Sequence, residues 1–313
     1  MLAVFFYVRL WRRSGVMTDI EFSGIRYSGK PAAFLRGFRA LYFGLPINCI
    51  VLGWVNLAMV KILVLVLNTD KFTAIVVVLF TIGITSWIFT LAGLWGVLVT
   101  DVVQFFIKMT MVIVLAVCAV QAVGGMDAMM TKLAAIDIAR GVTPGGKNSM
   151  LAFVPDLDSP YATRPWLWIL TALASVILYP GLAAPETGYI KVMIDHMQPS
   201  LRGLMLAGFA AAYMSTIATQ LNWGASYLLN DFYRRFLKPN ETGQHYVLMS
   251  QAATVVITLI SAGVTFYMDS IAGAWKLLIV TGAGTGGVLL LLRWYWWRVN
   301  ASSFVVSVAL QAI

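Results

Sequence analysis

Four small side chains share one helical face in an apolar stretch of the chain. Within residues 211–224, Ala212, Ser215, Thr216 and Thr219 follow one another at positions i, i+3, i+4 and i+7. Residues three and four apart lie above one another on a helix, so this spacing places all four on one side. Hydroxyl groups in an apolar helix either hydrogen-bond a neighbouring helix or offer neutral oxygens to a cation. The spacing by itself leaves both alternatives open.

Two further polar residues interrupt apolar stretches. Asp101 precedes a long hydrophobic run, and an acid inside a membrane is a functional candidate because it is costly to bury there. It is either such a functional residue or sits in a wet turn formed by residues 93–102. Asn56 lies in the middle of another apolar run. An asparagine in such a run usually hydrogen-bonds a second helix.

The composition defines the class of protein. Of the 313 residues, 60% are hydrophobic and 11% are charged, whereas soluble domains carry about 25% charged residues. The sequence therefore predicts an all-α integral membrane protein in a lipid bilayer. The formal charge of +9 indicates cytoplasmic loops, which collect Lys and Arg, and not a nucleic-acid partner. Cys49 and Cys118 both lie in apolar segments and indicate neither a disulfide framework nor a metal site.

Hydropathy divides the chain into apolar spans joined by polar loops. Residues 12–39 form a basic loop that is expected on the cytoplasmic side, and residues 124–165 form an external loop. The whole chain, 1–313, is expected to be one membrane domain. The expected spans are 40–67, 72–93, 96–123, 166–184, 203–229, 247–268 and 274–292.

Loop charges disagree with this number of spans. Arg234, Arg235 and Lys238 follow a span end that the count places outside, although Lys and Arg favour the cytoplasmic side. One explanation is that loop charge is only a bias or that one segment is re-entrant. The other is that a span is missing near residues 159–163. Asp231 is expected to pair with an arginine at this same helix end.

Several motifs resemble the sodium:solute symporter family, which includes sodium-coupled sugar and proline carriers. They occur in the order that the family shows and cover most of the chain. The matching segments are Gly53–Leu57, Gly93–Trp95, Thr100–Gln104, Ala211–Phe236, Ala274–Gly286 and Arg293–Arg298. The resemblance implies the leucine-transporter-type fold of two inverted five-helix repeats, with sites near the middle of the bilayer.

The resemblance also assigns roles to individual residues. It implies a sodium half-site at the Ala212 carbonyl and the Ser215 and Thr216 hydroxyls. It places Asp101 on the cytoplasmic sodium path and Asn56 near the solute pocket. The family's first core helix has no counterpart after Met1, and one inner helix is absent near residues 159–163. The chain is therefore expected to be a partial carrier, cut at both ends, which does not couple transport by itself.

Sodium-coupled import of a small polar solute is the function that the resemblance implies, with sodium as the coupling ion and the cytoplasmic membrane as the location. The alternative is a non-transporting sensor module of the same fold. An enzyme is not expected, because the sequence holds no HExxH motif, no serine paired with a histidine and no clustered acids. The sequence names neither the solute nor an oligomeric state.

Overall fold

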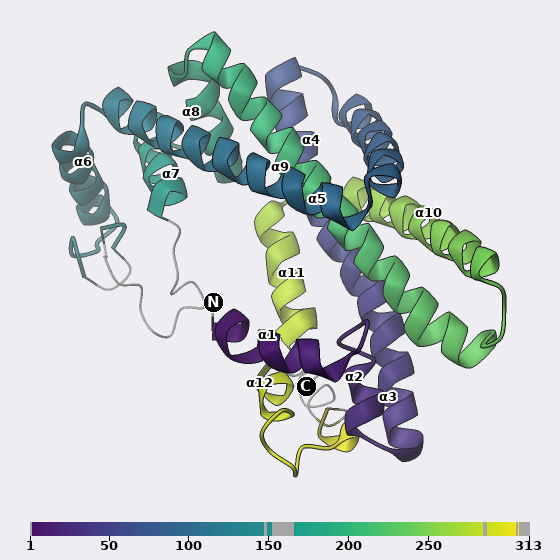
Figure 1. Ribbon diagram of the computed structural model, residues 1–313. Helices are drawn as coiled ribbons and strands as arrows, with labels where there is room; N and C mark the ends of the chain where they lie inside the picture. Colours follow the sequence, from purple (N-terminus) through teal and green to yellow (C-terminus); the bar gives the residue numbers. More distant parts are fainter. Residues whose placement is uncertain (1, 147–148, 152–165, 284–286, 305, 307–313) are drawn as a thin grey trace. The chain divides into compact units, whose positions relative to one another are not determined.

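A computed structural model describes residues 2–146, 149–151, 166–283, 287–304 and 306, and every regular element in this part is helical (Figure 1). The α-helices are α1 Leu2–Ser14, α2 Phe22–Arg26, α3 Gly29–Tyr42, α4 Asn48–Leu67, α5 Lys71–Val123, α6 Met126–Ala139, α7 Trp166–Leu178, α8 Gly188–His196, α9 Pro199–Ser226, α10 Gly243–Tyr267, α11 Ile271–Ala283 and α12 Gly287–Leu292. Two π-helical segments, η1 Phe43–Ile47 and η3 Tyr227–Leu237, continue α3 and α9, and η2 Pro185–Thr187 is a 3-10 turn.

Four helical stretches are long and apolar enough to cross a membrane. They are Gly29–Leu67, Asp101–Val123, Pro199–Leu237 and Gly243–Tyr267. Two shorter apolar helices are Lys71–Thr85 and Leu167–Leu178. These stretches confirm the prediction of an all-α, multi-span membrane protein.

Three details of the expected organisation are corrected by the helices. The spans 72–93 and 96–123 belong to one continuous helix, α5, so no turn forms over residues 93–102. The basic segment 12–39 is mostly helical, because it contains α2 and most of α3. The external segment 124–165 contains α6. The missing span near 159–163 lies outside the described residues and stays a prediction, as do the sides of both segments.

Local signals explain where α5 begins and ends. The Asp70 carboxylate accepts a hydrogen bond from the Thr73 backbone N–H at 3.0 Å, so it caps the first turn. At the other end, Gly124 has φ +105°, a left-handed conformation that glycine adopts at little cost. Between these caps no proline occurs to interrupt the helix. The hydropathy pattern could not show that Gly93 and Gly96 are tolerated inside it.

The chain packs as two compact units. Unit 1 comprises Met1–Ala58, Val78–Ser86 and Thr216–Ile313, and unit 2 comprises Met59–Val77 and Trp87–Ser215. The boundaries fall inside the helices α4, α5 and α9. The expectation of one membrane domain over residues 1–313 stays a prediction.

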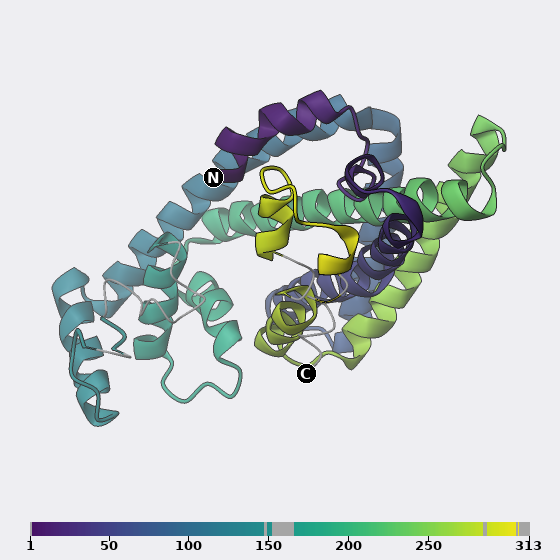
Figure 2. The same ribbon diagram turned by 90° about the horizontal axis from the view of Figure 1, so that it is seen from below.

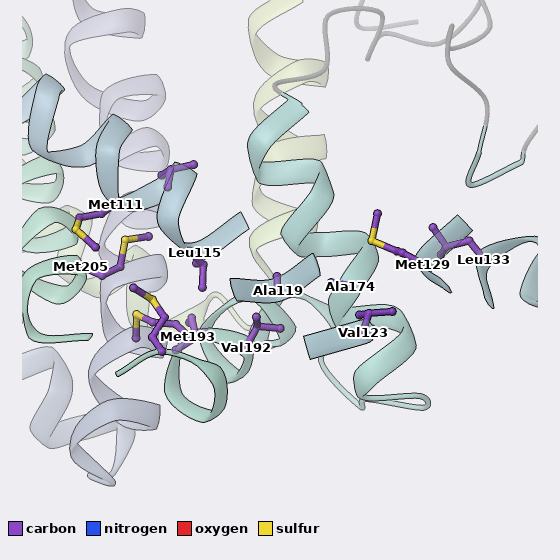
Figure 3. Packing of buried hydrophobic residues seen from close by; sticks show 13 residues of the cluster. Met111, Leu115, Ala119, Val123, Met129, Leu133, Ala174, Val192, Met193 and Met205 are labelled. Atoms are coloured by element: carbon purple, nitrogen blue, oxygen red, sulfur yellow. The ribbon is translucent and has the colours of Figure 1, made fainter. Parts of the chain in front are cut away.

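Unit 2 has a methionine-rich core. Met111 of α5, Met193 of α8 and Met205 of α9 converge in Figure 3 and are almost completely buried. The same cluster includes Met129 and Leu133 of α6, and α7 packs against both α6 and α8. Methionine is flexible and fills irregular gaps, which suits a core built from helices of different lengths.

Unit 1 is built around close contacts between α3, α4, η3 and α10. Figure 2 shows α3, in dark purple, beside the green end of α9 and η3. Gly53 of α4 lets α10 approach closely, since a Cβ atom there would lie 2.7 Å from the Val264 side chain. Small residues commonly permit such approaches between membrane helices. The end of α9 is thereby held in a tightly packed group of helices.

Candidate ion-binding site and its supports

Helix α9 carries the hydroxyl face that the sequence predicts. Ala212, Ser215 and Thr216 lie within its regular α-helical part, so their spacing puts them on one side of the helix. All three are half-buried, whereas Thr219, about one turn further on, is exposed. Residues 212–216 are therefore the part of this face that is partly enclosed by protein.

The chemistry of these donors suits a hard monovalent cation. Two hydroxyls and one carbonyl are neutral oxygen ligands, and a backbone carbonyl in a helix keeps a second lone pair for a ligand. No group of three or more His, Cys, Asp or Glu residues that could hold a metal occurs in the described ranges. Because hard cations take several oxygens, one helix face supplies half a site and another element must supply the rest.

A hydrogen bond from α4 anchors α9 one turn after the hydroxyls. Asn48 is completely buried, and its side-chain amide donates to the Gln220 carbonyl at 3.0 Å. Gly224 makes this contact possible. A Cβ atom at this position would overlap the Asn48 amide nitrogen and lie 3.0 Å from Cδ1 of Ile257. The packing of unit 1 therefore fixes where this part of α9 lies.

A buried ion pair holds the continuation of α9 as η3. Asp231 is 0% exposed, and its Oδ1 accepts from Nε and Nη2 of Arg36 at 2.8 and 2.7 Å. Its Oδ2 accepts from the Thr18 hydroxyl at 2.5 Å. The expected pairing of Asp231 with an arginine is confirmed, although the partner comes from α3. The neighbouring Arg234 and Arg235 are exposed.

Asp101 begins the membrane-length part of α5. It is half-buried, and its Oδ1 atom is shielded from solvent without a hydrogen-bond partner. Oε1 of Gln104, three residues further along the same helix, is also shielded and unpaired. The wet turn that was the alternative for Asp101 does not form, because α5 is helical throughout this region. Its place on a sodium path stays a prediction.

Asn56 lies in the interior of unit 1. It is 1% exposed and belongs to the regular part of α4. Complete burial against neighbouring helices favours the interhelical role over a pocket wall in this arrangement. A role in solute binding stays a prediction.

The sequence analysis did not predict one buried ion pair. Lys61 of α4 pairs with Glu186 of η2 inside unit 2. A lysine in an apolar helix could have indicated a buried partner. The partner could not be identified from the sequence because 125 residues separate the two.

Comparisons with known proteins find a family model that matches part of this chain. Residues 169–309 match the model of the sodium:solute symporter family. The match includes Ala212, Ser215 and Thr216, whereas Asn56 and Asp101 lie outside it. The resemblance predicted from the sequence motifs is confirmed.

Curated relatives are similar to this chain over part of their own length. The osmoregulated proline transporter OpuE of Bacillus subtilis is 25% identical over 270 residues, which cover 73% of this chain and 52% of that protein. The sodium/proline symporter of Haemophilus influenzae is 26% identical over 132 residues, 41% of this chain and 26% of that protein. The sodium/proline symporter of Staphylococcus aureus is 30% identical over 159 residues, 46% of this chain and 30% of that protein. The chain thus spans between about a quarter and a half of the length of these relatives.

A solved structure shares the fold. It is described as the substrate-bound outward-open state of a Na+-coupled sialic acid symporter, and it matches with a TM-score of 0.72 at 18% sequence identity. The match covers 97% of this chain and 72% of that protein. The expected leucine-transporter-type fold is therefore confirmed.

Proposed function

We propose that this chain, part of which matches the sodium:solute symporter family, acts in sodium-coupled secondary transport of a small polar solute across the cytoplasmic membrane. The observation that carries this proposal is the half-buried oxygen face of Ala212, Ser215 and Thr216, which lies inside the residues that match the family. The relatives named above are all transporters, which favours transport over the sensor alternative and over an enzyme.

Sodium binding at α9 is the first step of the proposed mechanism. The Ala212 carbonyl and the hydroxyls of Ser215 and Thr216 supply three neutral oxygens, and further oxygens come from another helix. Binding stabilises the outward-open state, and the solute then permits rocking of one helix bundle against the other. Sodium shifts the equilibrium between the two states only if it binds one of them with higher affinity than the other.

Two further residues have roles in this proposal. Asp101 lies on the route by which sodium leaves toward the cytoplasm, and its shielded, unpaired carboxylate oxygen supports a role in attracting the ion. Asn56 lines the solute pocket in a state of the carrier in which α4 is less closely covered. Proline and sialic acid are the first solutes to test, because relatives and a structural neighbour are named for them.

Uptake into proteoliposomes tests the proposal. Labelled proline and sialic acid are supplied with an inward sodium gradient, and a choline gradient of equal size is the baseline. Replacing Thr216 by Val removes the hydroxyl but keeps the shape of the side chain, so sodium stimulation is expected to fall at least tenfold. Thr216→Ser keeps the hydroxyl and is expected to retain it. Thr258→Ala is the matched control, because that hydroxyl bonds within α10 to the Thr254 carbonyl at 2.8 Å.

A chimera tests the ion site separately from the rest of the carrier. The hydroxyl face supplies only three of the oxygens that a hard cation takes, so a second test places it in a carrier that supplies the others. The segment 199–226 is therefore also placed in the Bacillus subtilis relative, and the Thr216 variants are compared there. Sodium-stimulated uptake that survives the combined Ser215→Ala and Thr216→Val replacements in this chimera would refute the ion site.

A further inference from the structure

A lysine lies deep inside a membrane-length segment of unit 2. Lys108 belongs to the span Asp101–Val123, seven residues after its first residue and fifteen before its last. At a rise of about 1.5 Å per residue, it is therefore about 10 Å from the nearer end of this span. A lysine side chain reaches only about 6 Å from its Cα atom. A charge at this depth is costly, which makes Lys108 a candidate for a function.

The helices around Lys108 leave its charge without a partner. Helix α5 contains one acidic residue, Asp101, and α9 contains none. Asp101 lies two turns away on the same face of α5, about 10 Å along the axis. Within the described ranges, the Lys108 ammonium forms neither an ion pair nor a hydrogen bond. The side chain is half-buried, so a positive charge stands partly enclosed by protein and uncompensated by it.

The stem of Lys108 lies against the face of α9 that carries the proposed ion ligands. A Cβ atom at Gly208 would lie 3.8 Å from Cγ of Lys108. Gly208, Ala212 and Ser215 stand at positions i, i+4 and i+7, so they share one side of α9. Along the helix axis, Gly208 is about 6 Å from Ala212 and about 10 Å from Ser215. All these residues belong to unit 2, so Lys108 is a near neighbour of the oxygen face.

Gly208 leaves room beside the lysine. Among the described residues, Lys108 is the only one with an atom within 4 Å of the position that a Cβ atom of Gly208 would occupy. A methyl group would therefore fit at this position, although Gly208 is buried. Its absence leaves a small open volume between the lysine stem and α9, into which part of a ligand can enter.

A sodium ion on the oxygen face and the Lys108 ammonium would repel each other. Both are cations, and at about 10 Å or less their repulsion is only weakly screened inside a protein. A carboxylate between the two would attract both. It would accept a charge-assisted hydrogen bond from the ammonium and offer an oxygen to the ion. A neutral solute would leave the repulsion uncompensated.

We propose that Lys108 binds the carboxylate of the transported solute, so that the carrier selects solutes with a carboxylate group. This inference rests on the proposed function, because it places the solute beside the ion on α9. Lys108 then has two opposite effects on sodium. It weakens sodium binding to the empty site, and it strengthens sodium binding when the solute carboxylate is present. Solute and ion therefore bind cooperatively, each raising the affinity for the other.

Thermal unfolding of the chain in nonionic micelles measures both ligands, because a ligand of the folded state raises the midpoint with its concentration. Sodium chloride is titrated against choline chloride, alone and together with proline or sialic acid. The methyl esters of the two acids are matched probes that lack the carboxylate. We expect the acids to raise the midpoint and the apparent sodium affinity, and the esters to do neither. No shift with either acid, or equal shifts with acids and esters, would overturn the proposal.

Variants assign the effect to Lys108. Lys108→Gln removes the charge and is expected to weaken acid binding about tenfold or more, through the loss of a charge-assisted hydrogen bond. The same variant should bind sodium about threefold or more tightly without solute, because the repulsion is gone. Lys108→Arg keeps the charge and should still prefer the acids. Lys276→Gln is the matched control, since this exposed lysine lies on the apolar helix α11, and it should bind as the unchanged chain does. A Lys108→Gln chain that still prefers the acids would refute the role of the lysine, and Lys108→Met gives a second reading if the Gln variant fails to fold.

The same titrations distinguish this inference from the ion site itself. A sodium shift that survives the combined Ser215→Ala and Thr216→Val replacements counts against the ion site alone. A preference for acids over esters that depends on Lys108 still supports the role of the lysine in that case. Conversely, a sodium shift that needs Ser215 and Thr216, without any preference for the acids, overturns the inference about Lys108 and leaves the ion site in place.

Discussion

Replacement of Gly224 by Ala should separate α9 from α4 at the point where they touch most closely. The added methyl group would occupy the space of the Asn48 amide and lie 3.0 Å from Cδ1 of Ile257. Asn48 is completely buried and donates to the Gln220 carbonyl. Its side chain therefore has no solvent-filled space into which it could turn, and either the hydrogen bond breaks or the helices move apart.

The expected loss follows from three contributions. An interhelical hydrogen bond in a membrane protein contributes about 0.6 kcal/mol on average and up to about 1.7 kcal/mol. Overpacking by one methyl group costs about 1–3 kcal/mol. Alanine regains up to about 1 kcal/mol through its higher helix propensity. We therefore expect Gly224→Ala to lower the free energy of unfolding by about 1–4 kcal/mol.

Equilibrium unfolding of the chain in micelles, followed by helix content as a denaturing detergent is added, measures this change. Gly263→Ala in α10 is the matched control, because a Cβ atom there meets nothing within 4 Å, and it should be neutral or stabilising. The decisive variant combines Gly224→Ala with Asn48→Ala, which removes the obstructing amide. The double variant should lose at least about 1 kcal/mol less than the two single losses combined. Simple additivity would refute the close contact as the cause.

Two further substitutions probe buried carboxylates. Asp231→Ala should destabilise the chain by about 3–5 kcal/mol in the same unfolding experiment, because it removes the closest partner of the buried Arg36 and leaves it only Glu21 at 3.5 Å. Glu241→Gln in a surface ion pair should change stability by less than about 1 kcal/mol, and similar effects of the two substitutions would contradict the buried pairing. The hydrogen bond from Ser149 lowers the pKa of Asp137 in the folded chain. The ionised carboxylate therefore stabilises the fold at pH values above the ordinary aspartate pKa of about 3.9. This stability is lost as the pH falls through the lower pKa of the folded state. Asp137→Asn should therefore be less stable than the unchanged chain at pH 6. The difference in unfolding free energy between the two should shrink between about pH 4 and pH 2. A difference that does not change with pH would refute the role of the ionised carboxylate.

Hydropathy and helical spacing predicted much of the architecture. The apolar runs at 40–67, 203–229 and 247–268 lie within membrane-length helices, and the face formed by Ala212, Ser215 and Thr216 required nothing beyond the 3.6-residue period. These features are local, so a sequence can carry them completely. The order of the motifs also predicted the resemblance to the family and the fold.

The corrections arise where distant contacts outweigh local signals. The arginines at 36 and 39 indicated a solvated loop, but they lie on a helix because Asp231 and Asp19 neutralise part of their charge. The Arg36–Asp231 pair spans 195 residues, and no spacing rule connects positions so far apart. Hydropathy likewise predicted the outer ends of α5 correctly. It could not show that the apolar runs 72–93 and 96–123 form one continuous helix instead of two. The positions of the polar residues were thus predictable, whereas their partners were not.

The π-helical turns of η1 and η3 bear on how the length of this chain can change. A π-helix bonds over five residues where an α-helix bonds over four, so it stores one extra residue per insertion. Removing a residue from a regular helix such as α10 swings everything beyond it by about 100° around the axis. In η3, the loss of one residue after Asp231 turns a π turn into an α turn, and the flanking side chains keep their neighbours. In η1 and η3 a membrane-length helix can therefore gain or lose a residue without rotating its far end. The Arg36–Asp231 ion pair would keep its position.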